Sequence, residues 1–120
     1  MKIMGSENKK KGELGELIAK KHLENSGYLI IDTNYKCPYG EIDIIAQYEN
    51  CICFIEVKYR KSLKFGMPRE SVTKSKQTKI QKTAMHYIFE NELTNIDLRF
   101  DVIEIIDDVK PEITHIPNAF

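Results

Sequence analysis

The sequence predicts an α/β domain built on a mixed β-sheet of about five strands, with helices flanking the sheet. Two longer segments carry apolar residues at helical spacing, and five shorter segments are apolar or alternate apolar with polar residues. These segments follow one another in the order α-β-β-β-α-β-β, which favours one sheet covered by helices. The 120 residues allow one hydrophobic core, so we expect a single domain over residues 1–120.

The first element is a helix over about residues 7–26. Its expected buried stripe consists of Leu14, Leu17, Ile18 and Leu23, which recur near helical spacing. Gly27 follows as a left-handed helix stop, and a strand over residues 28–32 begins directly after it.

Residues 41–46 and 51–58 read as the two strands of a β-hairpin. Pro38 and Gly40 mark a turn before the first strand, and Glu49 and Asn50 lie at the turn between the two. In the first strand the acids fall on odd positions and the apolar side chains on even ones, which is the alternation of a strand.

The second half supplies one helix and two strands. A loop leads to a helix over about residues 74–93, with Ile80, Ala84, Tyr87 and Ile88 on its buried face. Strands are expected over residues 99–106 and 113–116.

Charge is strongly segregated although the whole chain is neutral. Residues 58–82 contain nine basic residues and one acid, whereas residues 90–112 contain eight acids and two bases. A local cationic segment can hold a polyanion even when the net charge is zero. A solvated helix face and loop would produce the same composition, so charge alone leaves both interpretations open.

Targeting signals and disulfides are not expected. Residues 1–11 are polar and no segment approaches the ~20 apolar residues of a membrane span. We therefore expect a cytoplasmic protein without a membrane partner. The three cysteines, Cys37, Cys51 and Cys53, are expected to be free thiols, and Cys51-x-Cys53 lacks the second pair of a zinc site.

The hairpin predicts a cluster of charged side chains. A turn centred between Glu49 and Asn50 places Asp43 opposite Glu56 and Glu41 opposite Lys58. A loop of odd length would shift this register and break the cluster.

Carboxylates collected beside a lysine have a clear use in metal chemistry. Carboxylates at this distance repel one another, whereas Mg²⁺ takes carboxylate oxygens and keeps several waters. Such a site can hydrolyse a phosphodiester, with Lys58 orienting water or neutralising the phosphate and the Val57 carbonyl adding a ligand. The alternative is a solvated ion pair between Glu56 and Lys58, which is common on strands.

The chain resembles a known nuclease signature and, more closely, a known family. Gly40-Glu41-Ile42-Asp43 followed by Phe54-Ile55-Glu56-Val57-Lys58-Tyr59-Arg60 resembles the P-D…(D/E)-x-K signature, with Ile42 where the proline would stand. The chain also resembles the YraN family of small bacterial proteins, which has a restriction-endonuclease-like fold related to archaeal Holliday-junction resolvases. The segments carrying this resemblance include Gly15-Glu16, Gly27-Tyr28, Phe65-Gly66-Met67-Pro68, Ser71-Val72-Thr73, Ser75-Lys76-Gln77, Arg99-Phe100-Asp101-Val102 and Asn118-Ala119-Phe120.

The resemblance implies a role for each matching residue. It makes Asp43 and Glu56 metal-binding acids and Lys58 the catalytic lysine. It also makes Glu16 the acid from the first helix that completes the metal site. By spacing alone, Glu16 would be an exposed helix glutamate.

Further residues are expected around this site. Helical geometry places Lys76 and Gln77 beside the buried face of the second helix, so both lean towards the sheet, whereas Lys79 and Lys82 point away. Glu41 is expected to support the site. Contacts with a nucleic-acid backbone are expected from basic residues in and after the second hairpin strand, namely Arg60, Lys61, Lys64, Arg69 and Lys76.

Two functions follow as expectations. The first is a Mg²⁺- or Mn²⁺-dependent endonuclease acting on structured or branched DNA. By analogy with resolvases, such an enzyme could act as a homodimer. The second is a nucleic-acid-binding module of the same fold that does not cleave. A scaffold protein in which the acids are incidental is a third reading. The sequence leaves open whether the nucleic acid is DNA or RNA.

Overall fold

The computed structural model describes residues 2–60, 72–107 and 110–120, with side chains from residue 12 onward. The described elements follow the expected order of one helix, three strands, one helix and two strands. They are α1 (Lys2–Asn25), β1 (Leu29–Cys37), β2 (Gly40–Tyr48), β3 (Cys51–Arg60), α2 (Lys74–Glu90), β4 (Asp97–Ile106) and β5 (Glu112–Ile116).

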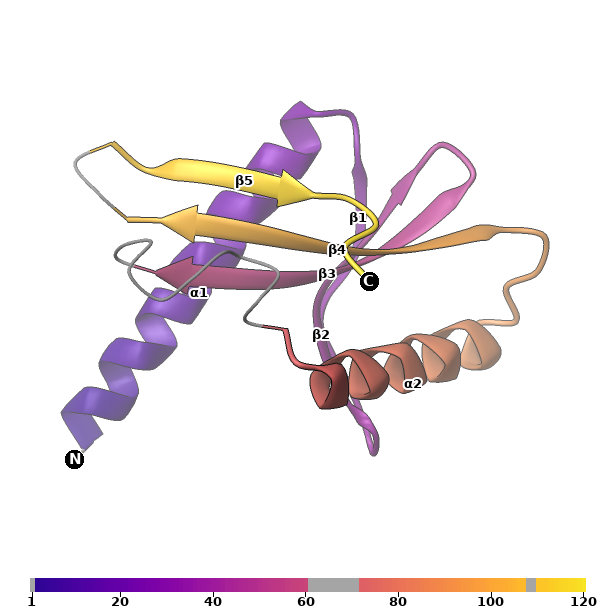
Figure 1. Ribbon diagram of the computed structural model, residues 1–120, viewed down its shortest axis with the longest axis horizontal. Helices are drawn as coiled ribbons and strands as arrows, with labels where there is room; N and C mark the ends of the chain where they lie inside the picture. Colours follow the sequence, from indigo (N-terminus) through magenta and orange to yellow (C-terminus); the bar gives the residue numbers. More distant parts are fainter. Residues whose placement is uncertain (1, 61–71, 108–109) are drawn as a thin grey trace.

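The five strands form one mixed sheet in the order β1-β2-β3-β4-β5. Neighbouring strands pair antiparallel except β3 and β4, which are parallel and are joined through α2. A parallel connection needs a crossover, and α2 supplies it. The two helices cover opposite faces of the sheet, with α1 passing behind it and α2 below it in Figure 1. The predicted fold class and element order are confirmed.

Helix α1 packs on the sheet through two small residues and part of the predicted leucine stripe. Leu14 and Leu17 are exposed, whereas Gly15, Ala19 and Leu23 are buried. A Cβ on Gly15 would lie 3.2 Å from two atoms of Tyr59, so this glycine allows a close approach to β3. The predicted stripe was wrong for Leu14 and Leu17 because the sheet selects a face on which the backbone comes close, but Leu23 is buried as predicted and Ile18 packs partly buried against the same core. No helix among the described residues is long and apolar enough to cross a membrane.

The ends of α1 and the face of α2 follow the expectations. Gly27 has φ +90° and donates its N–H to the carbonyl of Glu24, which is the predicted left-handed stop. On α2, Ile80, Ala84 and Tyr87 are buried in the core between this helix and the sheet. Strand β1 is longer than predicted, and its pairing with β2 shifts register just after Ile30.

The hairpin has the predicted register. Ile44 pairs with Ile55 and Tyr48 with Cys51, so the turn is centred between Glu49 and Asn50 as expected. The β2–β3 pairing ends at Ile44, so the predicted partners Asp43 and Glu56 do not pair within it, while the pairing of β1 with β2 continues to Gly40. Towards Gly40, β2 therefore separates from β3 and stays with β1.

Strand β2 twists sharply where it leaves β3. Ile42 packs in the core under α2, whereas Ile44 packs in the core under α1. A regular strand would place these two residues on one face. The residue at the twist is Asp43.

Candidate functional site

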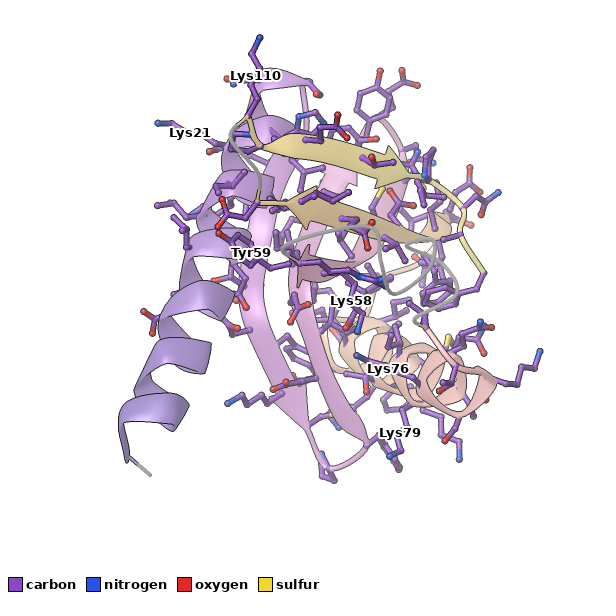
Figure 2. The ribbon with its side chains drawn as sticks, turned by 60° about the vertical axis from the view of Figure 1, so that its left-hand side comes forward. Lys21, Lys58, Tyr59, Lys76, Lys79 and Lys110 are labelled. Atoms are coloured by element: carbon purple, nitrogen blue, oxygen red, sulfur yellow. The ribbon has the colours of Figure 1, made fainter. Side chains whose placement is uncertain are left out.

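The predicted site lies where β2 and β3 separate, on the side of the sheet that faces α2. Glu56 and Lys58 lie two residues apart on β3 and therefore share one face. Figure 2 shows Lys58 and Lys76 directed into the space between β3 and α2, whereas Tyr59 extends towards α1. The strand twist and the docking of α2 thus bring residues from three elements together.

Asp43 is held in place by the backbone of β3. The backbone N–H of Val57 donates to Asp43 Oδ2 at 2.8 Å. Burial raises the pKa of Asp43 to about 7, and repulsion from Glu56 adds to this, with smaller contributions from Glu16 and Glu41, although the Val57 hydrogen bond lowers it. The carboxyl of Glu56 is therefore close enough to oppose the ionisation of Asp43.

Glu56 is buried and contacts two ammonium groups. Its Oε1 lies 2.6 Å from Lys76 Nζ and 3.4 Å from Lys58 Nζ. Glu56 is only 8% exposed, so these ion pairs are shielded from water. The prediction that Lys76 leans over the sheet towards the site is confirmed.

The pKa values of Lys58 and Lys76 are shifted in opposite directions. Burial and the nearby Lys76 lower the pKa of Lys58, against the attraction of Glu56. For Lys76, burial lowers the pKa, but the hydrogen bond to Glu56 and further contacts outweigh it, so the pKa is raised. A lysine with a lowered pKa is a better proton carrier near neutral pH.

Three predicted residues lie outside this contact. Glu41 is exposed and pairs with Lys36 at 3.9 Å, because β2 has left β3 at that point, so the predicted pairing of Glu41 with Lys58 was wrong. Glu16 Oε2 accepts a hydrogen bond from Asn34 Nδ2 at 2.9 Å. Gln77 donates to the Val72 carbonyl at 3.0 Å, which ties down the segment before α2. Glu16 nevertheless lies near enough to raise the pKa of Asp43.

A fully buried acid that the sequence analysis missed lies beside the site. Glu104 is the Cα partner of Lys58 across the parallel β3–β4 pair and is 0% exposed. Its Oε2 lies 2.7 Å from Arg60 Nε, so Arg60, which was predicted to bind nucleic acid, is held at the sheet. Burial raises the pKa of Glu104, while Arg60 lowers it. An acid inside the apolar run of residues 102–106 was the available signal.

A small cleft adjoins the site at the start of α2. Its volume is about 340 Å³, and Lys76 and Lys79 line it together with Thr73, whose side chain caps the helix. Helix N-termini and lysines both favour anions. The other predicted backbone contacts, Lys61, Lys64 and Arg69, lie outside the described residues.

Comparison with known proteins identifies the family. The model of the family described as "Uncharacterised protein family UPF0102" matches residues 15–105. The chain belongs to the UPF0102 family. This is the family that the sequence analysis names YraN.

UPF0102 proteins of several bacteria are similar to the chain over nearly its whole length. One from Alkaliphilus metalliredigens is 48% identical over 113 residues, covering 94% of this chain and 99% of the relative. Another from Clostridioides difficile is 48% identical over 113 residues, covering 94% and 98%. A third from Trichlorobacter lovleyi is 43% identical over 123 residues, covering 100% and 97%.

The donor chemistry of this UPF0102 chain fits a hard divalent cation held by two carboxylates. Mg²⁺ commonly takes one or two carboxylates and keeps its remaining waters. Asp43, Glu56 and the carbonyl of Val57 would provide such a set, and a cation would relieve the repulsion that raises the pKa of Asp43. Within the described ranges, no three His, Cys, Asp or Glu side chains are grouped to hold a metal. The three-acid site that includes Glu16 is therefore not assembled.

A second polar cluster of the UPF0102 chain lies on the opposite face and is structural in character. Asp101 is 0% exposed and accepts hydrogen bonds from Arg99 at 2.8 and 2.9 Å. It also lies 2.8 Å from His115 and accepts the backbone N–H of Asn118. Together with the hydrogen bond from Arg99 to Tyr28, this cluster ties β4 to β5 and to the start of β1.

Proposed function

We propose that the protein is a divalent-metal-dependent endonuclease that hydrolyses phosphodiester bonds in structured or branched DNA. The observation that carries the proposal is the meeting of Asp43, Glu56 and Lys58 at the point where β2 leaves β3. A buried acid beside a partly buried one, next to a lysine of lowered pKa, costs stability, and a catalytic role explains this arrangement. Family membership supports the fold but assigns no activity.

Each residue of the site has a distinct task in this proposal. Asp43 and Glu56, with the Val57 carbonyl, would hold Mg²⁺ or Mn²⁺. The bound ion supplies Lewis-acid chemistry, which makes water easier to deprotonate and stabilises negative charge on the phosphate. Lys58 Nζ holds the attacking water or exchanges a proton with it. Lys76, once its ammonium group has left Glu56, neutralises a phosphate.

The surroundings support a polyanionic substrate. The cleft that adjoins Glu56 is lined by Lys76 and Lys79 and by one acid, Glu41, so a phosphate next to the reacting one would meet a net positive charge. Such contacts position a nucleic acid without reading its sequence. A branched substrate with two equivalent strands would need two active sites. A homodimer would supply both, so it is part of the proposal.

One observation favours the alternative, a module of the same fold that binds nucleic acid without cleaving it. Lys76 already occupies Glu56 Oε1 at 2.6 Å, and this contact removes one carboxylate oxygen from metal binding. A protein that keeps this ion pair in the complex would bind a nucleic acid and leave it intact.

The test compares the wild type with Glu56→Gln and Lys58→Gln. Labelled four-way junction, flap, single-stranded and linear duplex DNA are incubated with each protein, with Mg²⁺, Mn²⁺ or chelator. Matched controls are Glu112→Gln and Lys110→Gln, which change exposed residues at β5 and just before it. Figure 2 places Lys110 at the far edge of the molecule from Lys58.

We expect metal-dependent cleavage by the wild type and both controls, and loss of at least roughly a hundredfold in rate for the two site variants. DNA binding should weaken with salt in every variant, because phosphate contacts release counterions. Cleavage that persists in Glu56→Gln would contradict the proposal. Salt-sensitive binding without cleavage of any substrate would replace it with the binding module.

A further inference from the structure

The outer face of α2 carries a groove that the proposed site does not use. The groove has a volume of about 1130 Å³ and runs along the helix from Thr78 to the residues that follow its C-terminal end. In Figure 1, α2 lies at the margin of the molecule, and no other described element covers its outer side. This groove and the sheet lie on opposite sides of the helix.

Large apolar side chains are exposed along this groove. Phe89 is 86% exposed, Met85 is 56% exposed, and Tyr39 from the β1–β2 turn is 54% exposed. Ile88 and Leu93 add partly buried apolar surface. Contiguous apolar surface of this kind is uncommon on a monomer and usually marks an interaction site.

The charges along α2 indicate which partner fits. The four lysines of α2 lie between its first residue and its midpoint at Lys82, whereas its one acid is the last residue, Glu90, and Glu92 follows just beyond the helix. The first turn has no acid and the last turn has no basic residue, so both ends oppose the helix dipole. A second α2 running in the opposite direction would bring Lys82 of one copy near Glu92 of the other, and both residues line the groove.

We propose that a second copy of this chain packs on this face, with the two α2 helices antiparallel about a two-fold axis. In sequence, Met85 and Phe89 are equally far from residue 87, as are Lys82 and Glu92, and all four residues line the groove. The same axis therefore places Met85 against Phe89 of the second copy and Lys82 against its Glu92. A two-fold interface requires this self-complementarity.

The interface has the composition of a real contact surface. The groove mixes both kinds of residue: its apolar and aromatic side chains are Tyr39, Met85, Ile88, Phe89 and Leu93, and its polar ones are Thr78, Gln81, Lys82, His86, Glu92 and Thr94. Burying Phe89 would remove the largest exposed apolar side chain of the described chain from water. The proposal rests on α2 alone and holds whether or not the protein cleaves DNA.

The first measurement is the molar mass of the full chain in solution by light scattering or sedimentation, over a range of protein concentrations. We expect a concentration-dependent dimer. Phe89→Ser should raise the dimer dissociation constant at least roughly tenfold, since a central aromatic residue dominates such interfaces. Lys79→Glu, which alters an exposed lysine of α2 outside the groove, is the matched control and should leave the dimer unchanged.

A charge exchange separates this geometry from any other dimer. Lys82→Glu alone places two acids opposite each other, and Glu92→Lys alone places two lysines opposite each other, so both single variants should be monomeric. A mixture of the two should form a heterodimer, and the chain carrying both changes should recover the homodimer. Circular dichroism of each variant verifies that it is folded, which these exposed positions favour.

Several outcomes would overturn the proposal. A wild type that stays monomeric at every concentration would do so, as would a dimer that Phe89→Ser leaves intact. Single charge variants that dimerise as well as the wild type would exclude the antiparallel pairing. A monomer in which Phe89→Ser weakens DNA binding would assign the groove to a nucleic acid instead.

Discussion

The raised pKa of Asp43 makes the site costly for folding, and Asp43→Asn should remove that cost. Burial, with repulsion from Glu56, raises this pKa from the ordinary 3.8 to about 7. The folded protein thus keeps a proton that the unfolded chain has released between about pH 4 and pH 7. Stability should therefore fall as pH rises through this window and level off above pH 7.

The size of the effect follows from the difference between the two pKa values. Each pH unit of that difference is worth roughly 1.4 kcal/mol, so the full penalty above pH 7 is about 4 kcal/mol. An asparagine has no charge to desolvate, and its carbonyl oxygen can still accept the N–H of Val57. We expect Asp43→Asn to be about 2–4 kcal/mol more stable than the wild type at pH 8 and within about 1 kcal/mol of it near pH 4.

Urea unfolding followed by circular dichroism measures this difference at the two pH values, in the presence of chelator. Asp97→Asn, an exposed position at the start of β4, is the matched control and should change stability by less than about 0.5 kcal/mol at both. If Asp43→Asn is no more stable than the wild type at pH 8, then ionisation of Asp43 does not destabilise the folded protein. An equal gain at both pH values would also refute the reasoning, because it would not depend on ionisation.

Two further predictions concern packing and the structural cluster. Gly15→Leu should destabilise the protein by about 1–3 kcal/mol in thermal or urea unfolding, because a Cβ there already lies 3.2 Å from Tyr59. The control Gly12→Ala, with open space at its Cβ, should stabilise the protein by about 0.5–1 kcal/mol, and equal effects of the two changes would contradict the close approach of α1. Asp101→Asn should cost about 3–5 kcal/mol near pH 7, because Arg99 loses its charge partner. The pKa of Asp101 is lowered by its partners despite burial, so this cost should shrink as pH falls through and below 4, and urea unfolding at pH 7 and pH 3 tests the trend.

The acid and lysine of β3 could be identified from the sequence because strand geometry is local. The alternation of side chains and a short turn set the hairpin register, which the structure confirms from Ile44 to Tyr48. The same reasoning failed for Glu41, because the twist at Asp43 depends on two cores that lie on opposite faces of the sheet. Periodicity within one strand contains no information about that twist.

For helix α2, the sequence predicted the direction of a side chain but not the residue that it contacts. Helical spacing predicted that Lys76 leans towards the sheet, and the structure adds that it meets Glu56 at 2.6 Å. Glu104 was missed because its place beside Lys58 arises from the parallel pairing of β3 with β4, across a connection that contains the whole of α2. Similarly, Leu14 and Leu17 of α1 were expected inside, but Gly15 and Ala19 face the sheet together with Leu23, which was predicted correctly.

The sequence by itself determined the order and type of the elements, the hairpin register and the set of charged residues available to the site. These properties depend on backbone periodicity and turns, which act over a few residues. Only the tertiary structure decided which charges meet, because the pairing of distant strands and the docking of both helices bury Asp43, Glu56 and Glu104 together with their partners. Burial, which raises the pKa values of Asp43 and Glu104, and proximity, which forms the ion pairs of Glu56 and Glu104, are properties of the packed chain.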